Sequence, residues 1–192
     1  KGELFGDGGL GARARLGLIV LQTDQTIEHE FAQLTGALGD VALYAARIPN
    51  AMEVSPETLR QMAIDLPHTA GLLPTQFDFD VVGYACTSGA TMIGEDRVDA
   101  LISGVHPQAK TTNPISAVKA ALTALGLKRF ALVTPYPVDV TVEMQANLQA
   151  AGFETTAVAS FGQSDDFTVA RISADSILQA VTQIGARDDC DG

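Results

Sequence analysis

The chain has 192 residues and a formal net charge of −11, with 46% hydrophobic and 18% charged residues. Such an acidic surface repels phosphate backbones and anionic lipid, so the composition argues against nucleic-acid and membrane-surface binding. No apolar run approaches the roughly 18–20 residues that cross a bilayer, and two cysteines cannot form a disulfide framework, so we expect a cytoplasmic protein with a substantial core.

Short apolar runs alternate with amphipathic stretches along the whole chain. Five apolar runs predict strands buried on both faces, at 16–21, 41–45, 81–85, 130–133 and 155–159. Apolar residues at helical spacing predict helices at 26–38, 56–70, 96–103, 114–125, 138–151 and 169–184. This alternation is typical of βαβ units, and it predicts an α/β fold with parallel sheets flanked by helices.

A weak internal repeat indicates two pseudo-symmetric Rossmann-like lobes. Shifting the chain by 113 positions aligns Arg15 with Lys128, and each copy then runs from a basic residue through a strand, loop and helix to a glycine. The identity is low, so the generic βαβ rhythm is an alternative explanation. We expect a flexible leader at 1–14, a first lobe at 15–112 and a second lobe at 113–192, with the active site in the cleft between the lobes.

The repeat also predicts how the second lobe ends. The counterpart of Asp80, which begins the predicted strand at 81–85, falls one place beyond Gly192. We therefore expect Cys190, Asp191 and Gly192 to begin the equivalent strand, and the second lobe to be incomplete at its C-terminal end.

Cys86 follows a predicted buried strand and precedes Thr87, Ser88 and Gly89. A strand that breaks into small hydroxyl and glycine residues before a helix predicts a nest of backbone amides. These amides and the helix N-terminus are expected to lower the pKa of the thiol, and with the two hydroxyls they could hold a substrate carboxylate. The alternative is that Cys86 is a small buried hydrophobe, as most cysteines outside disulfides are.

Two loops that follow predicted strands carry further candidates. Tyr136 stands between Pro135 and Pro137 on a stiff loop, where it either contacts a ligand or packs under a turn. Asp24 and Gln25 lie in the matching loop of the first lobe, where Asp24 or Thr26 is also a suitable N-cap for the next helix. Capping and ligand contact are compatible roles for Asp24.

Histidines and glycines give weaker signals. His29, His68 and His106 lack a second ligand at metal spacing, so we expect no metal. The glycine-rich stretch at 6–11 precedes a strand, whereas a dinucleotide-binding loop follows one. We therefore expect no nucleotide cofactor.

Three segments, taken together, resemble a known family. Thr23-Asp24-Gln25-Thr26, Cys86-Thr87-Ser88-Gly89 and Thr134-Pro135-Tyr136, in this order, are similar to the aspartate/glutamate racemase superfamily. The nearest branch is that of maleate cis–trans isomerase and arylmalonate decarboxylase. This resemblance implies a cofactor-independent enzyme in which Cys86 is catalytic and a small carboxylate is the substrate. It also implies a second cysteine in the other lobe, and Cys190 does not stand at that place.

From the loops and the resemblance together we expect eight residues to bind the substrate, namely Thr87, Ser88, Gly89, Tyr136, Gln25, Asp24, Pro135 and Asp166. The resemblance places Gln25 and Asp166 at positions where maleate isomerases have asparagine. This difference argues against maleate as the substrate. Arylmalonate decarboxylases have glycine at the position of Cys86.

We therefore expect an isomerase or racemase of a small carboxylic acid. An arylmalonate-type decarboxylase and a non-catalytic, two-lobed carboxylate-binding protein are the alternatives. A homo-oligomer is compatible with the sequence.

Overall fold

The computed structural model describes residue 2 and residues 4–191 of the chain. Positions 1 and 3 of the expected leader, and position 192 of the expected second lobe, lie outside the described residues. The described part of the leader forms no helix or strand before Ala14. Its flexibility stays a prediction, and so do the lobe boundaries.

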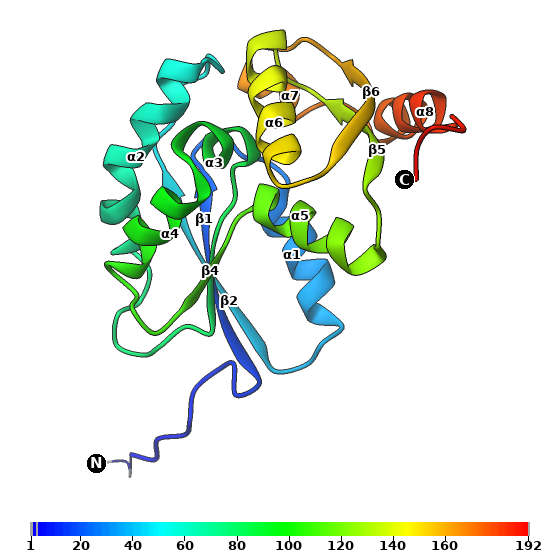
Figure 1. Cartoon of the computed structure of the whole chain (residues 1–192). Helices are drawn as coiled ribbons and strands as arrows, with labels where there is room; N and C mark the ends of the chain where they lie inside the picture. The colour runs from blue at the N-terminus through cyan, green and yellow to red at the C-terminus, as the bar shows by residue number, and fades with distance from the viewer. Residues whose placement is uncertain (1, 3, 192) are drawn as a thin grey trace.

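Two parallel sheets form the framework of the molecule (Figure 1). The first sheet has the strand order β2-β1-β3-β4, and the second consists of β5 and β6. The strands are β1 (Ala14–Leu21), β2 (Val41–Ile48), β3 (Val81–Tyr84), β4 (Lys110–Thr112), β5 (Arg129–Thr134) and β6 (Glu154–Ser160). The predicted α/β fold with parallel sheets is confirmed. β4 was not predicted because Lys-Thr-Thr contains no apolar run.

Helices connect and cover the strands. They are α1 (Ile27–Gly36), α2 (Pro56–Ala70), α3 (Thr87–Ile93), α4 (Glu95–Ser103), α5 (Pro114–Leu125), α6 (Val138–Ala150), α7 (Asp166–Val169) and α8 (Ala174–Gly185). The helix predicted at 169–184 is confirmed as α8, but its predicted start is wrong, because the chain leaves the helix after α7 and starts α8 only at Ala174. Ser173 caps α8 by accepting a hydrogen bond from the backbone N–H of Ser176, at 3.2 Å.

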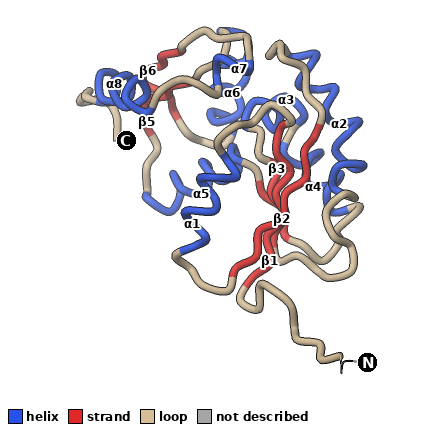
Figure 2. The backbone as a smooth tube through the Cα atoms, turned by 180° about the vertical axis from the view of Figure 1, so that it is seen from behind, coloured by secondary structure: helices blue, strands red, loops and turns tan. Residues whose placement is uncertain are grey.

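The core lies between the first sheet and the helices around it. Ile19 and Tyr84, at adjacent positions of β1 and β3, are fully buried, and Leu66 of α2 packs in the same cluster. Figures 1 and 2 show α2 and α4 on one side of this sheet and α1 on the other, with the second sheet toward the carboxyl ends of the strands. No helix in the described part of the chain is long and apolar enough to cross a membrane.

A pair of reciprocal hydrogen bonds between an arginine and an aspartate lies at the start of each sheet. In the first, the backbone N–H of Arg15 donates to Asp80 Oδ2 at 2.8 Å, and that of Asp80 donates to the Arg15 carbonyl at 2.9 Å. In the second, Arg129 and Asp191 exchange the equivalent bonds, at 3.0 and 2.6 Å. In this pattern Arg129 corresponds to Arg15 and Asp191 to Asp80, at offsets of 114 and 111 residues, whereas the predicted ungapped repeat has a single offset of 113 and pairs Lys128 with Arg15. A duplication of the whole lobe stays a prediction.

Glu95 links α4 to α5 and α6 through side-chain hydrogen bonds. Its carboxylate accepts hydrogen bonds from Ser116 and Lys119 of α5, and from Asn147 of α6 at 3.4 Å. Partial burial raises the pKa of Glu95, but the bonds from Lys119 and Ser116 outweigh it, and the net shift is downward. A lowered pKa means that the folded state is stabilised by the ionised form.

Glu95→Gln should therefore lower the free energy of unfolding by roughly 1–3 kcal/mol at pH 7, because charged hydrogen bonds are lost. The stabilisation is present above the unfolded-state pKa of about 4.3 and is lost as the pH falls below it, so the difference from the natural chain should shrink between about pH 5 and pH 3. Urea unfolding at several pH values measures this. Glu143→Gln, an exposed change on α6, is the control, and an equal loss at every pH would contradict the assignment.

Candidate active site

Cys86 lies at the carboxyl end of β3 and caps α3. Its Sγ accepts a hydrogen bond from the backbone N–H of Gly89 at 3.2 Å, and the hydroxyl of Ser88 lies 3.7 Å from the sulfur. Only 4% of the residue is exposed. The thiol is thus held in one position between the end of a strand and the first turn of a helix.

Gly89 packs against the thiol, and only a residue without a side chain fits there. A Cβ atom at this position would lie 2.9 Å from Cys86 Sγ and 2.5 Å from the Tyr84 hydroxyl oxygen. Any side chain would therefore push the sulfur out of place. Gly89 contributes its N–H and its lack of a side chain, and it does not line the cavity described below.

Burial raises the pKa of the Cys86 thiol above its ordinary value. The Gly89 N–H and the Ser88 and Tyr84 hydroxyls oppose this rise, whereas the negative charge of Asp166 adds to it. The expectation from the sequence that the pKa is lowered is therefore wrong. The predicted amide donor is present, but desolvation of a fully enclosed sulfur outweighs it.

A cavity of about 370 Å³ opens beside Cys86. The first sheet's loops contribute Thr23, Asp24, Thr87 and Ser88 to its wall, and the second sheet's loops contribute Tyr136 and Asp166. All of these residues follow the carboxyl ends of parallel strands, where α/β folds place their ligands. The cavity therefore lies where the loops of the two sheets meet.

Tyr136 is half-buried in this wall. Burial and the neighbouring Cys86 raise the pKa of Tyr136 to about 12, although hydrogen bonding with Ser88 and Thr87 opposes the rise. The phenol therefore keeps its proton at neutral pH. Protonated hydroxyls at this wall are hydrogen-bond donors for an anion that enters the cavity.

Asp24 lies at the start of α1, where Thr26 is the N-cap residue, and its contact with a ligand stays a prediction. Its Oδ1 accepts hydrogen bonds from the N–H groups of Thr26 and Ile27 at 2.9 Å each, at the start of α1, and the residue also lines the cavity. Gln25, by contrast, is exposed and does not line the cavity, and Pro135 lines a different, apolar hollow beside β5.

Asp166 belongs to a hydrogen-bonded network that joins the two sheets' loops. Its Oδ2 accepts hydrogen bonds from the Thr23 hydroxyl and from Asn50 Nδ2, the latter at 3.1 Å. We call Thr23, Asn50 and Asp166 the intersheet network. Asn50 was not predicted as a site residue. Its only signal in the sequence is that a polar side chain follows β2 by two residues.

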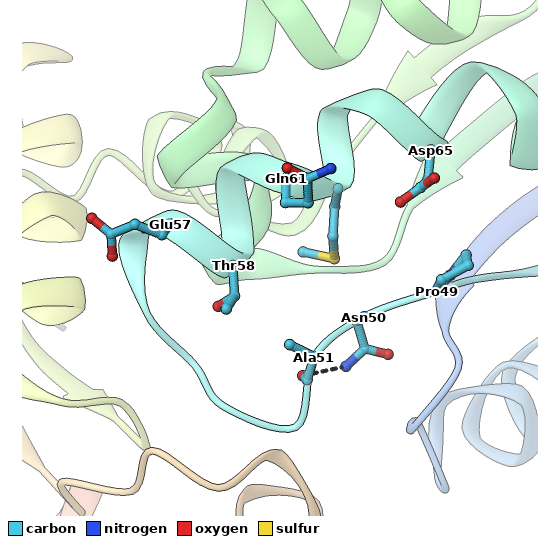
Figure 3. Close-up of a pocket in the computed structure, with 8 residues that line it drawn as sticks. Pro49, Asn50, Ala51, Glu57, Thr58, Gln61 and Asp65 are labelled. Carbon is cyan, nitrogen blue, oxygen red and sulfur yellow. Dashed lines mark hydrogen bonds between the residues drawn. The ribbon is translucent and has the colours of Figure 1, made fainter.

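A second hollow of about 410 Å³ borders this network at Asn50 and lies between the loop at Pro49, Asn50 and Ala51 and the facing side of α2 (Figure 3). Glu57 and Asp65 border it from α2. None of the described residues that line it is Cys, Tyr, His, Lys or Arg. This hollow thus has no thiol and no cationic or phenolic donor among its described lining residues, and the candidate chemistry stays with the cavity beside Cys86.

The comparisons with known proteins agree with this geometry. Residues 17–192 match the family model of arylmalonate decarboxylase. The chain belongs to the arylmalonate decarboxylase family. This membership confirms the resemblance to the Asp/Glu racemase-like superfamily. No curated protein matches the chain significantly.

Solved structures with the same fold include two maleate isomerases. One is a Nocardia farcinica maleate cis–trans isomerase mutant with a covalently bound succinylcysteine intermediate, at 24% identity and a TM-score of 0.80, covering 88% of this chain and 72% of that one. The isomerase from Pseudomonas putida has the same identity and TM-score, covering 93% and 75%. A liganded arylmalonate decarboxylase double mutant matches at 22% identity and a TM-score of 0.78, covering 92% and 74%.

The pKa of Cys86 is testable by alkylation. Because burial raises it, the rate of Cys86 modification by iodoacetamide should still be rising at pH 9, with a midpoint above that of an exposed reference thiol. Peptide mapping by mass spectrometry separates Cys86 from Cys190. A midpoint below the reference would show that the amide donor, not burial, dominates.

Gly89→Ala should displace the thiol and destabilise the fold by about 1–3 kcal/mol, because the added methyl group overpacks the space between Cys86 and Tyr84. Urea unfolding and the Cys86 alkylation rate measure the two effects. Gly36→Ala in α1 is the control, since a Cβ there meets no atom within 4 Å. Equal behaviour of the two variants would refute the steric role of Gly89.

Proposed function

We propose that the protein is a cofactor-independent isomerase or racemase of a small carboxylic acid, with the Cys86 thiolate as its reactive group. The observation that carries this proposal is the position of Cys86, whose sulfur is held by the Gly89 N–H beside a cavity lined by loops of both sheets. Family membership supports an enzyme, and it does not choose among the reactions of the family.

In the cis–trans isomerase version, the thiolate adds to the double bond of an unsaturated carboxylate. A carbon–sulfur bond forms, and the electron pair of the double bond moves onto the carboxylate to give an enediolate. Rotation about the new single bond and expulsion of the thiolate give the other geometric isomer. The succinylcysteine of the Nocardia farcinica enzyme is an adduct of this kind, which supports the addition step for a relative of the same fold.

In the racemase version, the Cys86 thiolate removes the proton from the carbon next to the carboxylate. The electron pair moves into the carboxylate, and a second acid returns a proton to the opposite face. Both versions need the thiolate, and the raised pKa of Cys86 means that only a minor fraction is ionised at neutral pH. Activity should therefore increase as the pH rises above 7.

Both versions also build negative charge on the substrate carboxylate. Thr87 and Ser88 line the cavity next to the thiol, and Tyr136 faces it from the other sheet's loop. Three hydroxyl donors fixed before the reaction begins would stabilise that charge as it develops. We therefore assign the carboxylate to these residues.

A malonate-type decarboxylation is the second candidate, because the matching family model is that of arylmalonate decarboxylase. Loss of carbon dioxide from one carboxylate would leave its electron pair on the other as an enediolate without a carbon–sulfur bond, and an acid of the second lobe would then donate the proton to carbon. Release of carbon dioxide from an arylmalonate distinguishes this reaction from isomerisation and racemisation.

Cys86→Ala should lower kcat at least a thousandfold, because the group that attacks or removes the proton is lost, while the unfolding curve stays close to that of the natural chain. The substrates to test are maleate, aspartate, hydantoin and arylmalonate. NMR in deuterated water follows the conversion of each. Cys190→Ala is the control, since Cys190 lies outside the cavity. Substrate binding without turnover in the natural chain would favour a carboxylate-binding protein instead.

A further inference from the structure

The charged residues that line the Cys86 cavity, among those the structure describes, are all acidic. Its wall includes the carboxylates of Asp24, Glu30 and Asp166, and none of the described residues that line it is Lys, Arg or His. The hydroxyls of Thr87, Ser88 and Tyr136 are neutral donors, which suffice for one substrate carboxylate. A second carboxylate would enter a site without a cation to balance it.

Of the three acidic residues, Asp166 is the half-buried one whose donors, Thr23 and Asn50, are neutral side chains that both reach the same oxygen. The carboxylate of Asp24 accepts two backbone N–H groups of α1, and Glu30 is exposed, so solvent screens its charge. Asp166 also lies near enough to Cys86 for its charge to act on the thiol.

Asp166 is also fixed in place. Its Oδ2 accepts hydrogen bonds from Thr23 and Asn50, in the loops after β1 and β2, and its backbone N–H donates to the Met52 carbonyl at 2.9 Å. The carboxylate cannot turn out of the wall without breaking these bonds. Within residues 4–191, no donor reaches its other oxygen, Oδ1, which leaves that oxygen as an acceptor for a ligand.

We propose that Asp166 selects the substrate class, namely a molecule with one carboxylate and a second polar group that donates hydrogen bonds, such as a carboxamide or an ammonium. This inference rests on the proposed function, because it assumes that Thr87, Ser88 and Tyr136 hold the first carboxylate. An N–H of the second group satisfies the acceptor on Asp166, whereas a second carboxylate is repelled. Dicarboxylates such as maleate and the malonates are thus poor ligands of the natural chain.

Maleate and maleamate test this directly, because they share one carbon skeleton and differ by a carboxylate in place of a carboxamide. Their dissociation constants are measured by calorimetry with the full chain carrying Cys86→Ala, which prevents turnover. We expect maleamate to bind at least tenfold more tightly than maleate. Adding Asp166→Asn, which keeps an acceptor for Thr23 and Asn50, should reduce this ratio at least tenfold, chiefly through tighter binding of maleate.

Glu143→Gln removes the same charge from an exposed position on α6 and should leave the ratio unchanged. The inference is overturned if the chain that keeps Asp166 binds maleate as tightly as maleamate or more tightly. It is also overturned if Asp166→Asn leaves the ratio of the two dissociation constants unchanged. Either result leaves the proposed function standing. If neither compound binds, and neither protects Cys86 of the natural chain from alkylation, the carboxylate site itself is wrong and both proposals fall.

Discussion

The parallel pairing of β1 with β3 is the constraint on which the site depends. Ile19 lies opposite Tyr84 in this register, so the chain leaves both strands at the same edge of the sheet, and Thr23 and Cys86 reach one cavity although they are far apart in sequence. Both strands are buried, so a slip of register would break the core as well as the site. β5 and β6 bring Tyr136 and Asp166 to the cavity by the same rule.

Burial fixes the position of Cys86 and also raises its pKa, which lowers the fraction of reactive thiolate. The Gly89 N–H, the Ser88 hydroxyl and the Tyr84 hydroxyl all favour the thiolate, yet enclosure of the sulfur and the charge of Asp166 favour the neutral thiol. The balance lies with the neutral thiol, because the loss of hydration is the largest of these effects.

The α/β architecture and the position of Cys86 could be predicted from the sequence because both depend on local patterns. Apolar runs marked β1, β2, β3, β5 and β6, and the change from Ala85 to Thr87, Ser88 and Gly89 marked the end of a strand. β4 and α7 were missed because they are short and polar. The direction of the thiol pKa was predicted wrongly, because desolvation depends on everything packed around the sulfur.

Asn50 and the pairing of Asp166 with Thr23 could not be predicted either, since they depend on how two loops from different sheets meet. Pro135 and Gln25 show the opposite difference, since both were expected at the site and neither lines the cavity beside Cys86. They neighbour site residues in the chain, but their own side chains lie elsewhere. Adjacency in the sequence is a poor guide within a loop, where successive side chains point in different directions.

The intersheet network has a consequence for how the family diversifies. Asp166 fastens two loops and shapes the cavity with one side chain, so specificity and stability cannot be changed independently at this position. Most replacements would lose the acceptor for Thr23 and Asn50 and loosen the fold before any new substrate could be used. Asparagine alone keeps both bonds and changes the charge, and a single base change separates its codons from those of aspartate. Under the role proposed for Asp166, a single base change in either direction would alter the charge that faces the substrate and keep the loops joined.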